Sequence, residues 1–196
     1  MIKIHLLTLG LYQTNCYIVH NSASQKCIII DPGYDAHIIM DKLEDLALDP
    51  KAILLTHGHF DHVGAVRDLA ATTGCRVYMR PEETAMPPQL TAGALYYSHE
   101  YPAEGKLQVA DMDILILHTP GHTAGSVCLL IEDAMFSGDT LFAGSMGRCD
   151  FPGSSIFEMR KSLRRLCALT KDYRVYPGHG ESSTLYYEKR TNPYLR

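Results

Sequence analysis

The chain has 196 residues, of which 46% are hydrophobic and 20% charged, and its formal net charge at pH 7 is −4. This length predicts a single domain over residues 1–196 with a substantial core. Because the chain is slightly acidic, it has no overall positive field to hold nucleic acid or an anionic membrane, and neither is expected as a partner. No apolar run approaches the roughly 20 residues of a membrane span, and the N-terminus lacks a signal-peptide pattern, so a cytoplasmic location is expected.

The first part of the chain alternates strand and helix patterns. An opening hairpin is predicted over residues 1–10 and 15–20, followed by strands over 26–31, 52–55 and 76–79. Asp35 is expected to cap a helix whose apolar residues run from Ile38 to Leu46 at helical spacing. A second helix is expected to begin at Asp61 and to end at Gly74.

The second part is richer in strand patterns, which cover residues 107–110, 113–117, 126–131, 134–136 and 173–176. Ser155 and Glu158 have the spacing of a capping box, which predicts a helix after them, and a last helix is expected from Ser182. Residues 81–104 have no clean period, and a loop near a site or a packed irregular insert would both fit. Sheets flanked by helices indicate a layered α/β protein. Six scattered cysteines without a C-x-x-C pair predict buried free thiols.

Residues 56–62 read T-H-G-H-F-D-H and place four potential metal ligands within six consecutive residues, namely His57, His59, Asp61 and His62. Imidazole and carboxylate groups together suit zinc and related first-row metals. One metal ion usually takes only three or four protein ligands, and His57 and His59 can reach a different point from Asp61 and His62. The spacing therefore predicts two neighbouring metal ions.

Three further candidate ligands each follow an apolar strand and a glycine. His122 lies in H-T-P-G-H-T, Asp139 in F-S-G-D-T and His179 in Y-P-G-H-G. Loops at one edge of a sheet can converge, and glycine lets the backbone turn tightly beside a metal. The remaining histidines, at positions 5, 20, 37, 99 and 118, are expected to be structural. The predicted division places His57, His59 and His122 on one metal and Asp61, His62 and His179 on the other, with Asp139 bridging both.

These motifs resemble a known family. T-H-x-H-x-D-H followed by G-H-T, G-D and G-H resembles the pattern of the metallo-β-lactamase superfamily, and within it the small glyoxalase II-like hydrolases. Residues 118–126, 136–142, 147–153, 175–180 and 187–193 also resemble segments of these hydrolases. The resemblance implies a four-layer αββα sandwich with a dinuclear site at one edge and the same seven ligands. It implies two divalent metal ions, with Zn²⁺ expected first and iron or manganese as alternatives.

The resemblance further implies a hydrolase that acts on a small molecule, a thioester such as a hydroxyacyl-glutathione. A metal-bound hydroxide is the expected nucleophile, and a thiolate leaving group, with a pKa of about 8.5, needs little protonation. Asp61 is expected to act in catalysis, as a ligand that also orients this hydroxide. Arg148, in G-R-C-D-F-P-G, is expected to bind an anionic end of the substrate.

Other functions compete with this one. A persulfide dioxygenase of the same superfamily would use a single iron, but Asp61, His62 and His179 together favour two metals. The acidic net charge and the lack of a basic stripe argue against a nuclease. A complete ligand set argues against a non-catalytic binding protein, and a β-lactamase stays open because a fold does not fix a function.

Overall fold

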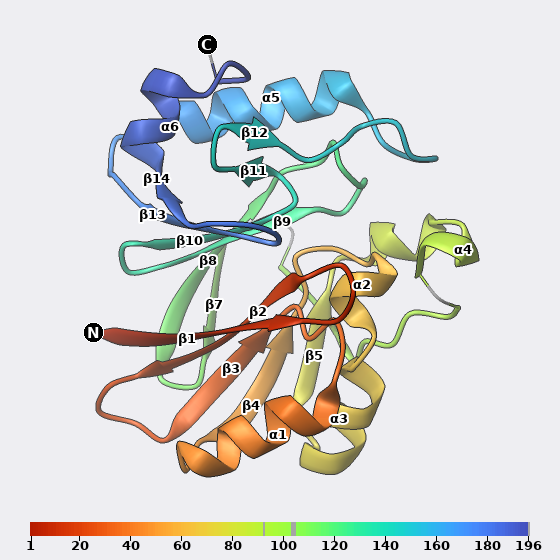
Figure 1. Ribbon diagram of the computed structural model, residues 1–196, viewed down its shortest axis with the longest axis vertical. Helices are drawn as coiled ribbons and strands as arrows, with labels where there is room; N and C mark the ends of the chain where they lie inside the picture. The colour runs from red at the N-terminus through yellow and green to blue at the C-terminus, as the bar shows by residue number, and fades with distance from the viewer. Residues whose placement is uncertain (92, 103–104, 196) are drawn as a thin grey trace.

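The computed structural model describes residues 1–91, 93–102 and 105–195. Two six-stranded sheets lie face to face, and helices cover the outer surface of each (Figure 1). The layers follow the order helix, sheet, sheet, helix, which confirms the expected αββα sandwich. Within the described part of the chain, no helix combines the length and the apolar character needed to cross a membrane.

The first sheet comes from the N-terminal half of the chain. Its strands are β1 (Ile2–Leu9), β2 (Thr14–Asn21), β3 (Lys26–Ile30), β4 (Asp49–Leu54), β5 (Arg76–Met79) and β6 (His99–Glu100), in that spatial order. The first three strands pair antiparallel, and β3 to β6 pair parallel. The helices of this half are α1 (Ala36–Asp45), α2 (Phe60–Val63) and α3 (Val66–Thr73), and the buried residues of α1 and α3 pack on the outer face of the sheet.

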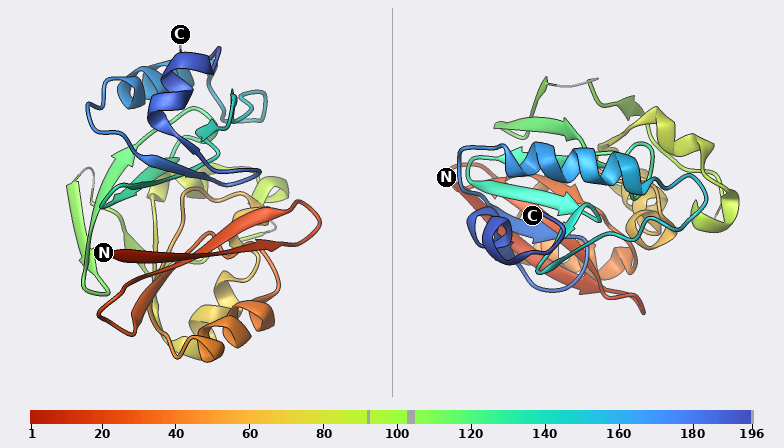
Figure 2. Two further views of the ribbon diagram at one scale, coloured as in Figure 1. Left: turned by 60° about the vertical axis from the view of Figure 1, so that its left-hand side comes forward. Right: turned by 90° about the horizontal axis from the view of Figure 1, so that it is seen from above.

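The second sheet comes from the C-terminal half, in the order β14-β13-β10-β9-β8-β7. Its strands are β7 (Gly105–Val109), β8 (Met112–His118), β9 (Val127–Ile131), β10 (Ala134–Gly138), β13 (Arg174–Pro177) and β14 (Ser183–Thr184). The short strands β11 (Leu141–Phe142) and β12 (Ser145–Met146) form a separate hairpin. Helices α5 (Ile156–Cys167) and α6 (Leu185–Thr191) pack on the outer face of this sheet, where they appear in blue in Figure 2.

The core is divided by the alternation of side chains along the strands. In β2, Tyr17 and Val19 enter the central layer between the sheets, whereas Cys16 and Ile18 point to the layer under α1 and α3. The central layer also holds Phe136, which is fully buried. Each fully buried large apolar side chain contributes about 1.5–3 kcal/mol relative to an exposed one. Both faces of each sheet are therefore anchored, and the loops at the strand ends project from a rigid base.

The helix that was expected from Asp61 to Gly74 is two helices, because α2 ends at Val63 and α3 begins at Val66. At the break, the backbone N–H of Ala65 donates to the carbonyl of Pro32 at 3.0 Å instead of continuing the helix. A Cβ on Gly64 would lie 2.1 Å from the Gly33 carbonyl oxygen, so the two loops touch there. The contact with residues 32–33 interrupts the helix, and the local pattern does not reveal it.

Two expectations about helix starts also need correction, and one is confirmed. Asp35 stands at the start of α1 but makes no capping bond with its side chain; its carboxylate accepts from Gly10 N instead. The last helix begins at Leu185 rather than Ser182, because Ser183 and Thr184 pair with β13 first. Ser155 does cap α5, where its hydroxyl oxygen accepts from the N–H of Glu158.

The described residues of the range 81–104 form a packed irregular insert that includes the 3₁₀ helix η1 (Pro81–Ala85), α4 (Pro88–Thr91) and β6. Residues 92, 103 and 104 of this range, and residue 196, lie outside the described residues. The insert also reaches the candidate site, since Leu90 lines its cavity. All six cysteines are free as expected, although only Cys16, Cys27 and Cys128 are buried.

Candidate metal centre

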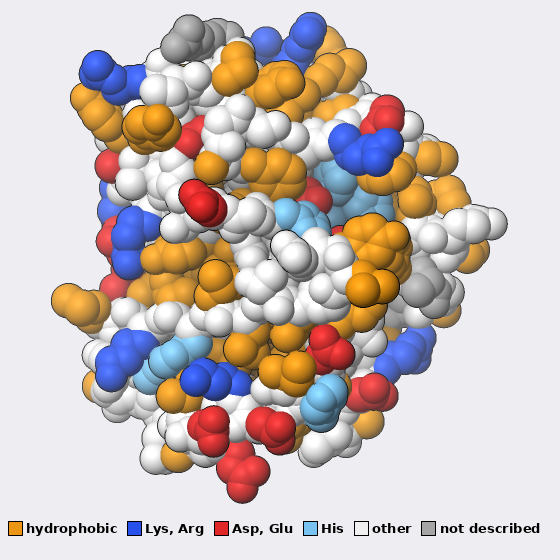
Figure 3. Space-filling view, in the orientation of Figure 1, with side chains coloured by type: hydrophobic (Ala, Val, Ile, Leu, Met, Phe, Trp, Pro, Cys, Tyr) orange, Lys and Arg blue, Asp and Glu red, His pale blue; other side chains and the backbone are white. Residues whose placement is uncertain are grey.

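The fold brings all seven predicted ligands to one edge, where loops from both sheets meet. His57 and His59 follow β4, Asp61 and His62 lie in α2, His122 joins β8 to β9, Asp139 follows β10 and His179 follows β13. Figure 3 shows histidine side chains gathered with a carboxylate in a hollow on this face. Residues 63 and 117 positions apart in sequence, His59 with His122 and His62 with His179, thus become neighbours, as the repeated order of strand, glycine and polar residue indicates.

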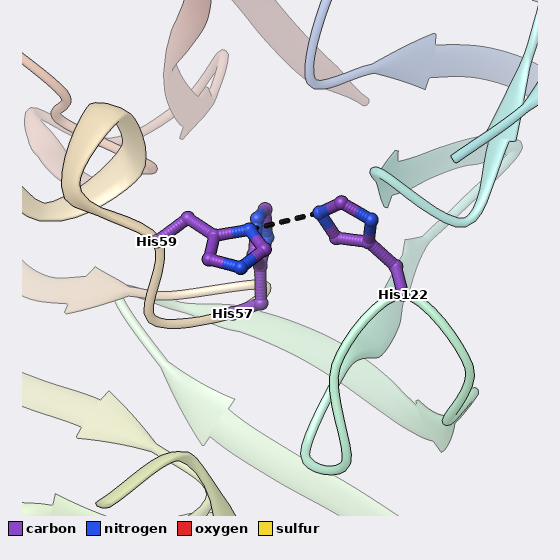
Figure 4. A group of neighbouring side chains, drawn as sticks. All are labelled: His57, His59 and His122. Carbon is purple, nitrogen blue, oxygen red and sulfur yellow. Dashed lines mark hydrogen bonds between the residues drawn. The ribbon is translucent and has the colours of Figure 1, made fainter. Parts of the chain in front are cut away.

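The first group consists of the imidazoles of His57, His59 and His122, all buried. Their ligand atoms lie within 4.8 Å of one another. Figure 4 shows the rings of His59 and His122 approaching from separate loops, with His59 Nδ1 and His122 Nε2 2.9 Å apart. His57 Nε2 and His59 Nε2 are buried without a hydrogen-bond partner among the described residues. Such buried polar atoms are costly unless something binds them.

Neighbouring oxygen atoms orient the rings of this group. The Nδ1 of His122 donates to the carbonyl oxygen of Arg148 at 2.8 Å, which leaves its Nε2 free to accept. The Nδ1 of His57 lies 3.0 Å from the hydroxyl of Thr56. These contacts select the ring nitrogen that faces the centre.

The second group consists of Asp61, His62 and His179, whose ligand atoms also lie within 4.8 Å of one another. His179 Nε2 is 3.2 Å from Asp61 Oδ2 and 3.3 Å from His62 Nε2. The Nδ1 of His179 donates to the carbonyl of Tyr12 at 3.1 Å. This group is less enclosed than the first, because the His179 side chain is 28% exposed.

Asp139 lies between the two groups. Its Oδ1 is 3.5 Å from His62 Nε2, and its Oδ2 is 3.5 Å from His122 Nε2. The buried Oδ1 has no hydrogen-bond partner within the described part of the chain. A Cβ on Gly178 would lie 2.2 Å from this oxygen, so a glycine is required there. The residues fit a pair of metal ions, because the nitrogen and oxygen donors converge and several of them are otherwise unsatisfied.

The two groups also differ in their electrostatics. Burial, together with the neighbouring imidazoles, lowers the pKa of His59 to about 4. Burial alone would also lower the pKa of His62, but the carboxylates of Asp139 and Asp31 outweigh it and raise the pKa to about 9. Burial would raise the pKa of Asp61, but the hydrogen bond from His179 and the charge of His62 lower it to about 2. Asp61 is therefore charged at neutral pH.

Sequence reasoning missed Asp31, which directs the ring of His62. Asp31 is 2% exposed and accepts from Thr56 N at 2.7 Å, from Thr56 Oγ1 at 2.6 Å and from His62 Nδ1 at 3.0 Å. Its carboxylate also lies within 4.8 Å of ligand atoms of His57 and His62. We assign it an orienting role, because three hydrogen bonds already occupy its oxygens. The available signal was its place after the apolar run C-I-I-I, which matches that of Asp139 after its own strand.

A cavity of about 640 Å³ opens over the centre. Its walls are largely apolar and include Tyr12, Phe60, Leu90, Phe142, Met146 and Phe151. Arg148 is the one arginine or lysine among the described lining residues. Its guanidinium donates to both oxygens of Asp150, at 2.6 and 2.7 Å, and lies 4.1 Å from the centre of the Phe151 ring. The arrangement provides polar groups at the floor and an apolar space above them.

The sequence and the fold are similar to those of known proteins. A model of the metallo-beta-lactamase superfamily matches residues 9–179. Hydroxyacylglutathione hydrolase GloC of Haemophilus influenzae is 33% identical over 208 residues, which cover 98% of each chain. The crystal structure of BLEG-1 B3 metallo-beta-lactamase has a TM-score of 0.91 at 34% identity and covers 100% of this chain and 99% of its own. That of TTHA1623 in a di-iron-bound form has a TM-score of 0.83 at 36% identity and covers 97% and 100%. The chain therefore belongs to the metallo-β-lactamase superfamily.

Proposed function

We propose that the protein hydrolyses thioesters at a dinuclear metal centre. His57, His59 and His122 would hold one ion, Asp61, His62 and His179 the other, and Asp139 would bridge them. One observation carries the proposal. Two complete ligand groups meet at a shared carboxylate, with buried nitrogen and oxygen atoms that no described residue satisfies.

When bound, two divalent ions lower the pKa of a coordinated water and stabilise negative charge on the attacked carbonyl oxygen. We take Zn²⁺ as the first candidate, and the di-iron form of TTHA1623 supports iron as an alternative, with manganese the third. Asp61 is the proposed catalytic residue. Its low pKa keeps it charged, so that it can accept a hydrogen bond and orient the attacking group at the cavity floor.

The cavity supports a small thioester as the substrate. Its apolar walls can hold an acyl group above the ligands. A thiolate leaving group has a pKa of about 8.5 and needs little help from a general acid. The relative GloC carries the name hydroxyacylglutathione hydrolase, which makes a hydroxyacyl-glutathione the first substrate to test. We propose that Arg148, at the cavity wall, contacts an anionic end of such a substrate.

The test combines elemental analysis of the purified protein with hydrolysis of S-D-lactoylglutathione. We expect two metal ions per chain, and a fall of about a hundredfold or more in kcat for Asp61→Ala, because the variant loses a ligand and the orienting carboxylate. His37→Ala is the control. That histidine is exposed on α1 and lies outside both ligand groups, so its removal should leave the metal content unchanged.

Two results would contradict the proposal. The first is unchanged thioester cleavage in Asp61→Ala. The second is one iron per chain together with oxygen consumption on glutathione persulfide, which would instead support a mononuclear dioxygenase.

A further inference from the structure

A buried glutamate outside the ligand set touches both loops of the first group. Glu83 lies in η1, in the irregular insert, and is fully buried. Its Oε2 accepts from the backbone N–H of Gly58 at 2.6 Å, and its Oε1 accepts from that of Gly125, also at 2.6 Å. Each carboxylate oxygen is thus used by a different loop.

These two loops supply all the ligands of the first group. Gly58 stands between His57 and His59, in the loop that follows β4 of the first sheet. Gly125 lies three residues after His122, in the loop between β8 and β9 of the second sheet. Glu83 therefore connects one sheet to the other beside the ligands.

Neither glycine has room for an unhindered Cβ beside this carboxylate. A Cβ on Gly125 would lie 2.6 Å from Glu83 Oε1, and one on Gly58 would lie 3.2 Å from Oε2. A second link, the backbone bond from Val127 N to the Thr56 carbonyl at 2.9 Å, joins the start of β9 to the residue before His57. Without Glu83, the N–H groups of Gly58 and Gly125 would lose their acceptor in a buried setting.

We propose that Glu83 is a positioning residue that fixes the distance between His57 and His59 on one loop and His122 on the other. It would thereby set the affinity of the first ligand group for its metal. The inference rests on the metal centre of the proposed function and adds to it a residue that binds no metal. Partners beyond the ligands themselves often change metal affinity 10- to 100-fold when they are mutated.

The experiment is a titration of the metal-free protein with Co²⁺, followed by visible absorption, for wild type and Glu83→Gln. The glutamine keeps the size of the side chain but turns an amide NH₂ toward one of the two N–H donors. We expect the affinity for the first Co²⁺ to fall about tenfold or more and its absorption bands to shift, because the ligand geometry changes.

Glu188→Gln is the matched control, because Glu188 is equally buried and also accepts from a backbone N–H, that of Gly144 at 2.8 Å. Among the described residues, the hydrogen bonds of Glu188 reach neither ligand loop of the first group. We expect it to lower the melting temperature of the metal-free protein and to leave the Co²⁺ affinity and spectrum unchanged.

A second variant keeps the test decisive if Glu83→Gln does not fold. Gly125→Ala retains Glu83 but places a methyl group against its Oε1, so it should weaken the first Co²⁺ in the same direction. The proposal would be overturned if both variants bound Co²⁺ with the affinity of wild type. An equal loss of Co²⁺ affinity in Glu188→Gln would also overturn it. If wild type itself bound no Co²⁺, the metal centre would fail, and this inference would fall with it; bound Co²⁺ without thioester hydrolysis would count against the proposed substrate alone.

Discussion

The two ligand groups lie side by side yet differ in charge. In the first group, burial lowers the pKa of His57, His59 and His122, so all three rings are neutral at neutral pH. In the second group, carboxylates outweigh the effect of burial and raise the pKa of His62 and His179. Metal binding to the first group therefore displaces few protons, whereas metal binding to the second must compete with protons held by its imidazoles.

The groups also depend on different supports. Glu83 and the carbonyl of Arg148 hold the first group, through Gly58, Gly125 and the ring of His122. The second depends on Asp31 and on a link from β2, since Asn15 Nδ2 donates to the carbonyls of Pro177 and Gly180 on either side of His179. One group can therefore be weakened by mutation while the other is retained.

The sharpest separation of the two groups should come from Asp31→Asn. The asparagine can still accept from Thr56 N through its Oδ1, but its amide NH₂ cannot accept from His62 Nδ1, which loses its negative partner. We expect the affinity for the second metal ion to fall about 10- to 100-fold, as is typical of such partners. A stepwise Co²⁺ titration measures both ions.

Thr56→Val provides the matched comparison for that variant. It removes the hydroxyl that lies between Asp31 and His57, so it should weaken the first ion and largely spare the second. If Asp31→Asn and Thr56→Val each lowered the affinity for both ions equally, the two groups would not be independent. That result would contradict the difference between the groups.

A change of pH should separate the groups without a mutation. The pKa of His62 is about 9, so His62 is protonated before the metal binds at pH 6.5 and at pH 7.5. The proton must leave, and the affinity for the second ion should fall about tenfold per displaced proton when the pH is lowered by one unit. His59, with a pKa of about 4, is neutral at both pH values, so the first ion should be little affected. Zn²⁺ competition titrations at the two pH values would measure this, and equal slopes for both ions would contradict it.

The sequence allowed the candidate ligands to be picked out because they follow a pattern. Four of them stand in T-H-G-H-F-D-H, and the other three repeat the order of strand, glycine and ligand. Strand ends gather at a sheet edge in a layered α/β fold, so such a pattern translates directly into spatial proximity.

The supporting residues could not be found in the same way. Glu82 and Glu83 are adjacent in a segment without periodicity, and only the fold turns Glu83 inward while Glu82 pairs with Arg80 near the surface. In the sequence, Asp31 marks only the end of a strand, in D-P-G. Its contact with His62, 31 residues later, appears only in the fold. These roles depend on contacts between distant segments, which local pattern does not contain.

The smallest effect is expected from Arg148→Ala. This variant changes the wall of the cavity and leaves the candidate ligands at its floor in place. The variant keeps the backbone carbonyl that accepts from His122, so both metal ions should remain. The Arg148 side chain is 59% exposed and pairs with the exposed Asp150, and exposed ion pairs contribute little. We therefore expect KM for S-D-lactoylglutathione to rise by roughly fivefold, with kcat unchanged, if the guanidinium binds an anionic end of the substrate. A neutral thioester of a short uncharged thiol should show no change. Equal effects on the charged and neutral substrates would place the role of Arg148 in the shape of the wall and not in its charge.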